Sequence, residues 1–154
     1  MLTENEKTKI QHEIEQSEYP RAACVEALRI LQTQRGWVSD DDIRDLAPLL
    51  GMTPDELDAV ATFYPFVFRK PVGRHVIFVC DSVSCWIMGY ENLLSRLKER
   101  LRISIGETTT DGRFTLLPVS CIGACDRAPA MMIDGDLHLN LDPEKLDRLL
   151  ERYE

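Results

Sequence analysis

The hydrophobic pattern of this chain changes once, near residues 63–73, and that change constrains the fold more than any other feature. Before it, apolar residues recur with the spacing of amphipathic helices, whereas after it short β-branched runs alternate with helical segments. The segment between them, FYPFVFRKPVG, holds two prolines and three phenylalanines and continues neither pattern. We therefore expect an α+β protein with a helical bundle over residues 1–65, a linker over 66–74 and an α/β domain over 75–154.

Start and stop signals divide the first part into helices. Ser39 with Asp42, and Thr53 with Glu56, have the spacing of capping boxes, and Gly36 and Gly51 are placed to end helices. A weaker helical pattern covers Glu4 to Gln16. The predicted apolar faces of the other helices are Cys24, Ala27, Leu28 and Leu31, then Ile43, Leu46, Ala47 and Leu50, then Leu57, Val60, Ala61 and Tyr64.

The second part predicts a mixed sheet with helices between its strands. The runs HVIFVC and FTLLPVSC read as strands, and ENLLSRLKERL between them reads as a helix. Asp134 and Gly135 stand between two apolar runs, which is a hairpin signal. A last helix begins at Asp142 and Pro143 and is expected to bury Leu146, Leu149, Leu150 and Tyr153 on one face.

Composition excludes several classes of function. The net charge of −8 and the pI of about 4.9 argue against a nucleic-acid or anionic-lipid surface, because both need clustered Lys and Arg. No apolar run approaches the roughly 20 residues of a membrane helix, so we expect no direct membrane contact. The first residues lack the apolar stretch of a secretory signal and the five cysteines cannot all pair, so we expect a cytoplasmic protein with reduced thiols.

Four of the cysteines form two short pairs that lie far apart in the chain. Cys80 and Cys85 are five residues apart, and Cys121 and Cys125 are four apart. Each pair begins where an apolar run ends. If those runs are neighbouring strands, all four sulfurs meet at one edge of the sheet, where thiolates bind zinc or iron-sulfur clusters.

The spacing favours a two-iron cluster but leaves zinc and free thiols open. Closed zinc sites use short Cys knuckles around one ion, and spacers of four and three residues are long for that purpose. A two-iron cluster is larger and suits two separate loops, with Gly123 allowing close backbone approach and Ser82 and Ser84 offering hydrogen bonds. A Rieske centre is not expected because none of the three histidines, His12, His75 and His138, lies in these loops.

Several longer stretches carry a resemblance to a known family. GWVSDDDI, ATFYPFVFRKPVGRHVIFVCDSVSC, GETTTDGRFTLLPVSCIGACDRAPAMMID and LDPEKLDRLLERY together resemble the E-type subunits of bacterial proton-translocating NADH:quinone oxidoreductase, the respiratory complex I. These subunits have a thioredoxin-like [2Fe-2S] ferredoxin domain behind an N-terminal helical bundle. In such a layout Pro129, just before the third strand, stands where a cis proline is common.

The resemblance implies a function, ligands and partners. The family's cluster ligands fall on Cys80, Cys85, Cys121 and Cys125, while Cys24 matches no ligand. The implied role is a single-electron carrier within an oxidoreductase, without a substrate-binding catalytic site of its own. The implied partners are the flavin- and NADH-binding subunit and other peripheral-arm subunits, which would hold this protein at the inner membrane. The alternatives are the equivalent diaphorase subunit of an NAD-linked hydrogenase or formate dehydrogenase, and a structural zinc module with four cysteine ligands.

Residues near the ligands have two interpretations each. Trp86 either shields the cluster from water or packs in the core. A series of aromatic residues is expected to be buried between the two domains, and the alternative is that it anchors an interface with a partner. The series is Phe63, Tyr64, Phe66 and Phe68. Nearby cations either pair with an acidic partner or stay solvated; they are Arg69, Lys70 and Arg74. Asp81 and Asp126 would lower the cluster potential, with Arg127 opposing them, or serve as loop caps.

Overall fold

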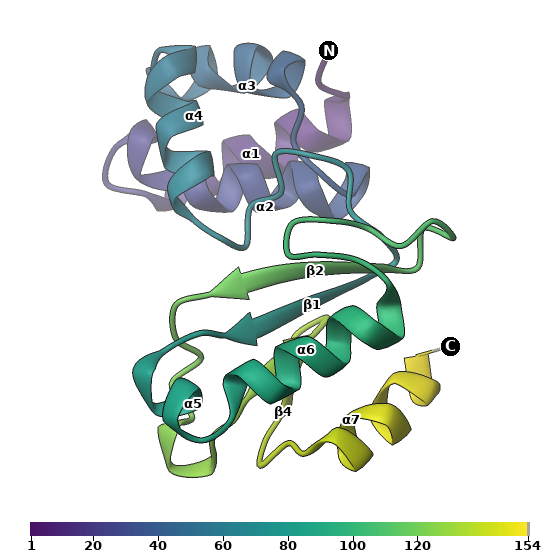
Figure 1. The fold of residues 1–154 in the computed structure, drawn as a ribbon. Helices are drawn as coiled ribbons and strands as arrows, with labels where there is room; N and C mark the ends of the chain where they lie inside the picture. Colours follow the sequence, from purple (N-terminus) through teal and green to yellow (C-terminus); the bar gives the residue numbers. More distant parts are fainter. Residues whose placement is uncertain (154) are drawn as a thin grey trace. The chain divides into compact units, whose positions relative to one another are not determined.

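The computed structural model describes residues 1–153 and divides the chain into two compact units, Met1–Pro71 and the part from Val72 onward (Figure 1). The first unit contains helices only, and the second is built on a mixed sheet. The predicted α+β class is therefore confirmed. Each unit has a hydrophobic core of its own.

The elements of the N-terminal unit follow the predicted caps. The two predicted capping boxes, Ser39 with Asp42 and Thr53 with Glu56, have both of their hydrogen bonds. A third box, Thr3 with Glu6, was not predicted. Gly36 and Gly51 end their helices in the left-handed conformation. The elements are α1 (Glu4–Gln16), η1 (Pro20–Ala23), α2 (Cys24–Arg35), α3 (Asp40–Leu46), η2 (Ala47–Leu50) and α4 (Pro54–Phe63).

Two predicted details of this unit are wrong. The helix expected to run to Leu50 ends at Leu46 and continues as the tighter η2 turn, because Pro48 has no N–H to extend the α-helical ladder. Tyr64, placed on the apolar face of α4, instead follows its last residue and is exposed. Cys24 is only partly buried and packs against the core from its margin.

One buried ion-pair cluster ties α1 to α2 and α3. Arg35 donates to both carboxylate oxygens of Glu6, at 2.7 and 2.6 Å, and also binds Asp42. The Glu6 side chain is only 2% exposed. The hydrogen bond from Arg35 holds the pKa of Glu6 at about 2, below its ordinary 4.5, although burial opposes the shift.

The C-terminal unit contains a four-stranded sheet in the order β2-β1-β3-β4. β1 pairs in parallel with β2 and antiparallel with β3, which pairs antiparallel with β4. The elements are β1 (His75–Cys80), α5 (Val83–Ile87), α6 (Tyr90–Leu101), β2 (Phe114–Val119), η3 (Cys125–Arg127), β3 (Met131–Ile133), β4 (Asp136–His138), α7 (Pro143–Leu150) and η4 (Glu151–Tyr153).

Both predicted local features of the second unit are present. Asp134 and Gly135 form the two-residue turn of the β3–β4 hairpin, both with positive φ. The Ala128–Pro129 peptide bond is cis. Helix α5, within the first cysteine pair, was not predicted, because five residues are too few to show a helical period.

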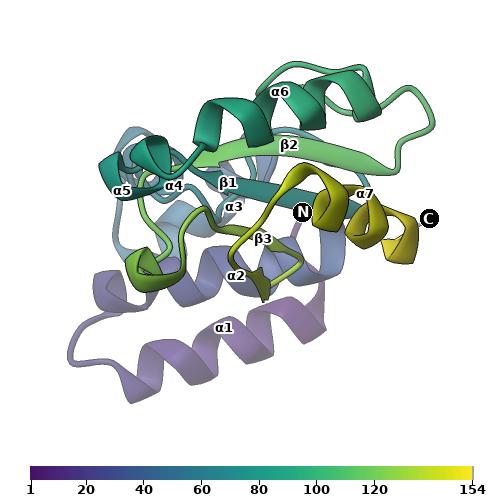
Figure 2. The same cartoon turned by 60° about the horizontal axis from the view of Figure 1, so that its bottom comes forward.

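Helices α6 and α7 cover one face of the sheet (Figure 2). Alternate residues of the strands, such as Ile77 and Leu116, enter a core that also contains Leu97 of α6 and Leu146 of α7. No helix within residues 1–153 is both long enough and apolar enough to cross a membrane.

Candidate metal centre

The sheet brings the two cysteine loops to one edge. In the parallel pair β1–β2, Cys80 is the Cα partner of Val119, and Asp81 N–H donates to Val119 O at 3.1 Å. The loops that follow parallel neighbours leave the sheet at the same edge. The expectation that the two apolar runs are adjacent strands is therefore confirmed.

The four thiols at this edge differ in their exposure. Cys80 and Cys85 are buried, while Cys121 and Cys125 are exposed. Cys80 and Cys125 both raise the pKa of the Cys85 thiol, so these three residues lie near one another. Within residues 1–153, however, no three Cys, His, Asp or Glu side chains are gathered closely enough to hold a single metal ion.

Without a metal, the Cys85 thiol resists ionisation. Burial raises its pKa to about 11, and the neighbouring Cys80 and Cys125 add to the rise, while a hydrogen bond from the backbone of Ala130 opposes it. A coordinated cation reverses this preference because it deprotonates the thiol that binds it. The chemistry of the donor set thus suits a metal centre, for which thiolates are the soft ligands.

Ala130 is a contact residue that sequence reasoning missed. Its N–H donates to the Cys85 thiol, and its carbonyl accepts from Cys80 N at 3.3 Å. It follows the cis Pro129, whose carbonyl accepts from Leu141 N at 3.2 Å. Only its position directly after that proline could have drawn attention to it.

Gly123 forms a left-handed turn in the second cysteine loop. Its φ of +82° is a conformation that L-residues rarely adopt, and nothing lies within 4 Å of a Cβ placed there. The backbone turn therefore favours glycine at this position, and the expected close approach of the backbone to a cluster stays a prediction. Its N–H donates to Cys121 Sγ at 3.3 Å, whereas the hydroxyls of Ser82 and Ser84 make no hydrogen bond within residues 1–153.

An exposed apolar patch lies beside the buried thiols. It consists of side chains of α5 and the residue after it, namely Val83, Trp86, Ile87 and Met88. Trp86 is 56% exposed and donates from Nε1 to Glu91 at 3.1 Å, so it is not a core residue.

Phe63, Tyr64 and Phe66 are exposed on the N-terminal unit. Their burial between the two domains stays a prediction. Arg69 is neither solvated nor available to pair with an acidic partner protein, because its guanidinium binds Asp40 and Asp58 within its own unit.

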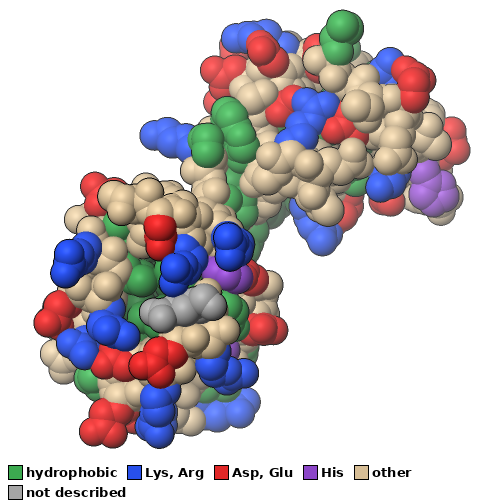
Figure 3. Space-filling view, turned by 90° about the vertical axis from the view of Figure 1, so that its right-hand side faces the viewer, with side chains coloured by type: hydrophobic (Ala, Val, Ile, Leu, Met, Phe, Trp, Pro, Cys, Tyr) green, Lys and Arg blue, Asp and Glu red, His purple; other side chains and the backbone are tan. Residues whose placement is uncertain are grey.

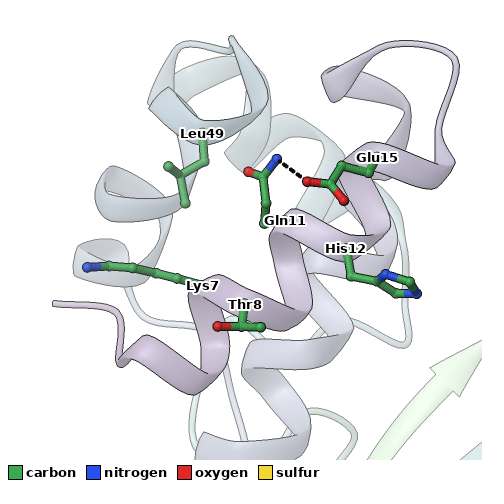
Figure 4. Close-up of a pocket in the computed structure, with 6 residues that line it drawn as sticks. All are labelled: Lys7, Thr8, Gln11, His12, Glu15 and Leu49. Atoms are coloured by element: carbon green, nitrogen blue, oxygen red, sulfur yellow. Dashed lines mark hydrogen bonds between the residues drawn. The ribbon is translucent and has the colours of Figure 1, made fainter.

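The histidines lie outside the cysteine loops. His12 is on the surface of α1, where it lines a shallow groove of about 520 Å³ together with Gln11 and Leu49. Its ring points away from these two side chains (Figure 4). His75 Nδ1 lies 2.5 Å from Asp134 Oδ2, and His138 Nε2 lies 3.2 Å from the Tyr153 hydroxyl. None of them joins the thiols.

A mixed sheet with two helices on one face, a cis proline before β3 and two thiol-bearing loops at one edge define a thioredoxin-like protein built for a metal centre. The chain belongs to the family of thioredoxin-like [2Fe-2S] ferredoxins, whose model matches residues 10–154. Family membership confirms the thioredoxin-like part of the predicted fold class.

Its relatives include E subunits of NADH-quinone oxidoreductase. The chain is 50% identical over 153 residues to the E subunit of NADH-quinone oxidoreductase from Pseudomonas aeruginosa, covering 99% of this chain and 92% of the relative. It is 53% identical over 152 residues to the subunit of the same name from Escherichia coli, with coverages of 99% and 92%. A crystal structure of an NAD+-reducing [NiFe]-hydrogenase is also similar, with a TM-score of 0.72 and 29% identity over 85% of this chain and 22% of that chain.

Proposed function

We propose that this chain is an electron-transfer subunit of an NADH-quinone oxidoreductase, and that Cys80, Cys85, Cys121 and Cys125 hold its [2Fe-2S] cluster. The family and the identity of about half to relatives of that name support the function. The parallel strands that deliver both cysteine pairs to one sheet edge support the ligand assignment. Residues 75–154 form the cluster domain in this proposal, with 1–65 as the helical domain and 66–74 as the linker.

A cluster fits these thiols better than a single ion does. The spacers of four and three residues within the cysteine pairs are long for a closed zinc site, whereas a two-iron cluster would be held by one pair of thiolates from each loop. When bound, the cluster supplies one-electron redox chemistry. The chain contributes the N–H groups of Ala130 and Gly123, which donate to sulfur and stabilise its negative charge.

Charge beside the loops is mixed. Asp81 and Asp126 place negative charge next to ligands and disfavour the added electron. Arg127 opposes them, and its Nε lies 3.4 Å from Asp126 Oδ2 on the exposed second loop. We expect the acidic pair to dominate, because the single cation in these loops can neutralise only one of the two carboxylates.

The apolar patch on α5 is where the partner docks in this proposal. An electron-transfer partner must approach the cluster, and an exposed apolar patch next to its ligands marks such an interface. The partner is the flavin- and NADH-binding subunit, and other peripheral-arm subunits attach the protein to the cytoplasmic side of the inner membrane. The similarity to the hydrogenase keeps an equivalent diaphorase role as the second candidate.

The ligand assignment is tested by Cys121→Ser, with Cys24→Ser as the control in the other unit. After anaerobic reconstitution, the wild type and the control are expected to be coloured, with equal iron and sulfide and a paramagnetic signal on reduction. Cys121→Ser is expected to lose most iron or to shift that signal. A colourless zinc protein, or an unchanged signal in Cys121→Ser, contradicts the assignment.

The docking site is tested by Val83→Asp and Ile87→Asp, two exposed positions of the patch, 67% and 70% exposed. Both variants are expected to keep the cluster spectrum and to lose the flavoprotein subunit during co-purification. Leu49→Asp, an exposed leucine of the N-terminal unit, is the control and should retain it. Retention of the flavoprotein by the α5 variants places its interface elsewhere.

A further inference from the structure

The two outer strands of the sheet, β2 and β4, differ in what lies beside them. Along β2, residues 106–109 run beside the strand, with Gly106 N–H donating to Leu116 O at 2.7 Å and Leu116 N–H donating to Glu107 O at 3.1 Å. At the other edge, no strand within residues 1–153 pairs with the outer side of β4. Proteins usually cover or shorten an exposed edge because it can accept another strand. The edge at β4 is short and uncovered.

The uncovered edge borders a groove of about 450 Å³ between β4, the segment after it and α7. Leu137 lies on its β4 side and is 44% exposed, and the buried residues Leu141 and Leu149 also line it. Figures 1 and 2 show α7 beside the hairpin. The groove thus offers apolar surface next to unpaired backbone.

Cations line the same groove in a protein of net charge −8. They are Lys145, Arg148 and Arg152, and no carboxylate among the described residues lines the groove. Lys145 lies 3.3 Å from Asp142 Oδ2, but no described carboxylate pairs with Arg148 or Arg152. Figure 3 shows several Lys and Arg side chains on the C-terminal unit, with Asp and Glu side chains among them.

The hairpin register decides which peptide groups face outward. Ile133 and Asp136 flank the two-residue turn and are Cα partners, so they form the hydrogen-bonded pair next to the turn. Because hydrogen-bonded and non-bonded pairs alternate, the peptide groups of Leu137 point away from β3. Leu137 therefore presents an N–H and a C=O along the groove.

We propose that this groove binds an extended acidic segment of a partner protein, which adds to β4 as a further strand. The open edge supplies backbone pairing, the leucines accept alternate apolar side chains, and the arginines attract the acidic ones. This inference goes beyond the proposed function, because it concerns a surface distinct from the cysteine loops and from α5.

The probe is a fluorescein-labelled peptide of about eight residues in which glutamates alternate with leucines, measured by fluorescence anisotropy with the full cluster-loaded protein. We expect saturable binding that weakens about tenfold in the double variant Arg148→Glu/Arg152→Glu, since attraction becomes repulsion at both sites. The control is Arg29→Glu/Arg44→Glu, which changes the net charge equally at side chains 65% and 62% exposed in the other unit. An equal loss in the control overturns the proposal, because it shows a net-charge effect.

N-methylated peptides separate strand addition from simple charge attraction. Methyl groups on one set of alternate amides should abolish binding, while methylation of the other set should leave it within about twofold, because only one set pairs with an edge. If both methylated peptides bind equally, or if pyrophosphate displaces the peptide at equal concentration, the groove is an anion site and the proposal fails. A dimer that the arginine variants dissociate, without peptide binding to the monomer, makes a second copy the occupant and also overturns it.

Discussion

Cys80 and Val119 are the last partners of the parallel pair β1–β2, and Cys121 follows Val119 by two residues. This register sets which loops meet at the sheet edge. A shift of one residue would turn the side chains of a strand to its opposite face. The position of the second cysteine loop therefore depends on the strand as much as on the loop itself.

The left-handed turn at Gly123 can be tested with a matched glycine. Gly123→Ala should cost about 1 kcal/mol of backbone strain and reduce the cluster content after reconstitution. Gly36→Ala is the control, because Gly36 has the same φ of +82° and equally open surroundings in the N-terminal unit. Denaturant unfolding should show a similar destabilisation in both variants. Iron analysis should show a loss of cluster only in Gly123→Ala. Equal cluster content in the two variants contradicts a role for the turn.

The Glu6–Arg35 ion pair makes the free energy of unfolding depend on pH in the acid range. Between pH 4.5 and about 2, the unfolded chain binds a proton at Glu6 that the folded chain does not. The stabilisation is thus complete above pH 4.5 and is lost as the pH falls through this window. The pKa difference corresponds to roughly 3 kcal/mol, so Glu6→Gln should lower the free energy of unfolding by about that amount at neutral pH and flatten its acid dependence.

Glu4→Gln is the control for this prediction. The Glu4 side chain is 90% exposed and pairs with Lys7 on the same helix, so its loss should change stability little. Urea unfolding followed by circular dichroism at several pH values measures both variants. Equal losses of unfolding free energy in Glu4→Gln and Glu6→Gln would show that the buried ion pair stabilises the fold no more than the exposed one.

Arg69, near the end of the N-terminal unit, binds residues of α3 and α4. Its guanidinium binds Asp40 and Asp58 and donates to the carbonyl of Val38. Arg69→Ala should lower the free energy of unfolding by about 2 kcal/mol, since hydrogen bonds to charged groups are among the stronger ones. Lys70→Ala, at the next and exposed position, should change it by less than about 0.5 kcal/mol. Indistinguishable unfolding curves for the two variants would contradict the assignment.

His138 gives the C-terminal unit a dependence on pH near neutrality. Burial lowers its pKa and Arg152 adds to this, while Asp136 opposes it. Because the folded chain binds this proton less readily than the unfolded chain, stability should be full above about pH 6.5 and fall as the pH decreases below it. His138→Gln should remove that slope, which thermal unfolding at a series of pH values measures. An unchanged slope would assign the effect to another group.

The features predicted from sequence are those that depend on neighbours along the backbone. The capping boxes at Ser39 and Thr53 and the turn at Asp134 need only a few adjacent residues, and all are present. The adjacency of the two cysteine loops was also predictable, because each pair begins where an apolar run ends. Family resemblance then identified the fold and the cofactor.

The features that were missed depend on residues far apart in sequence. Arg35 meets Glu6 across 29 positions, and Ala130 meets Cys80 and Cys85 only after the sheet has formed. Pairings of this kind leave no local pattern, so propensity and period cannot reveal them.

The crossover between the parallel strands β1 and β2 sets the order in which the protein can mature. Both strands must be synthesised and aligned before the second pair of thiols arrives beside the first. A ribosome-bound fragment that stops before Cys121 therefore contains only Cys80 and Cys85 of the four proposed ligands. In the proposed ligand assignment, a cluster held by both loops can therefore form only after both loops have been synthesised and β1 and β2 have paired.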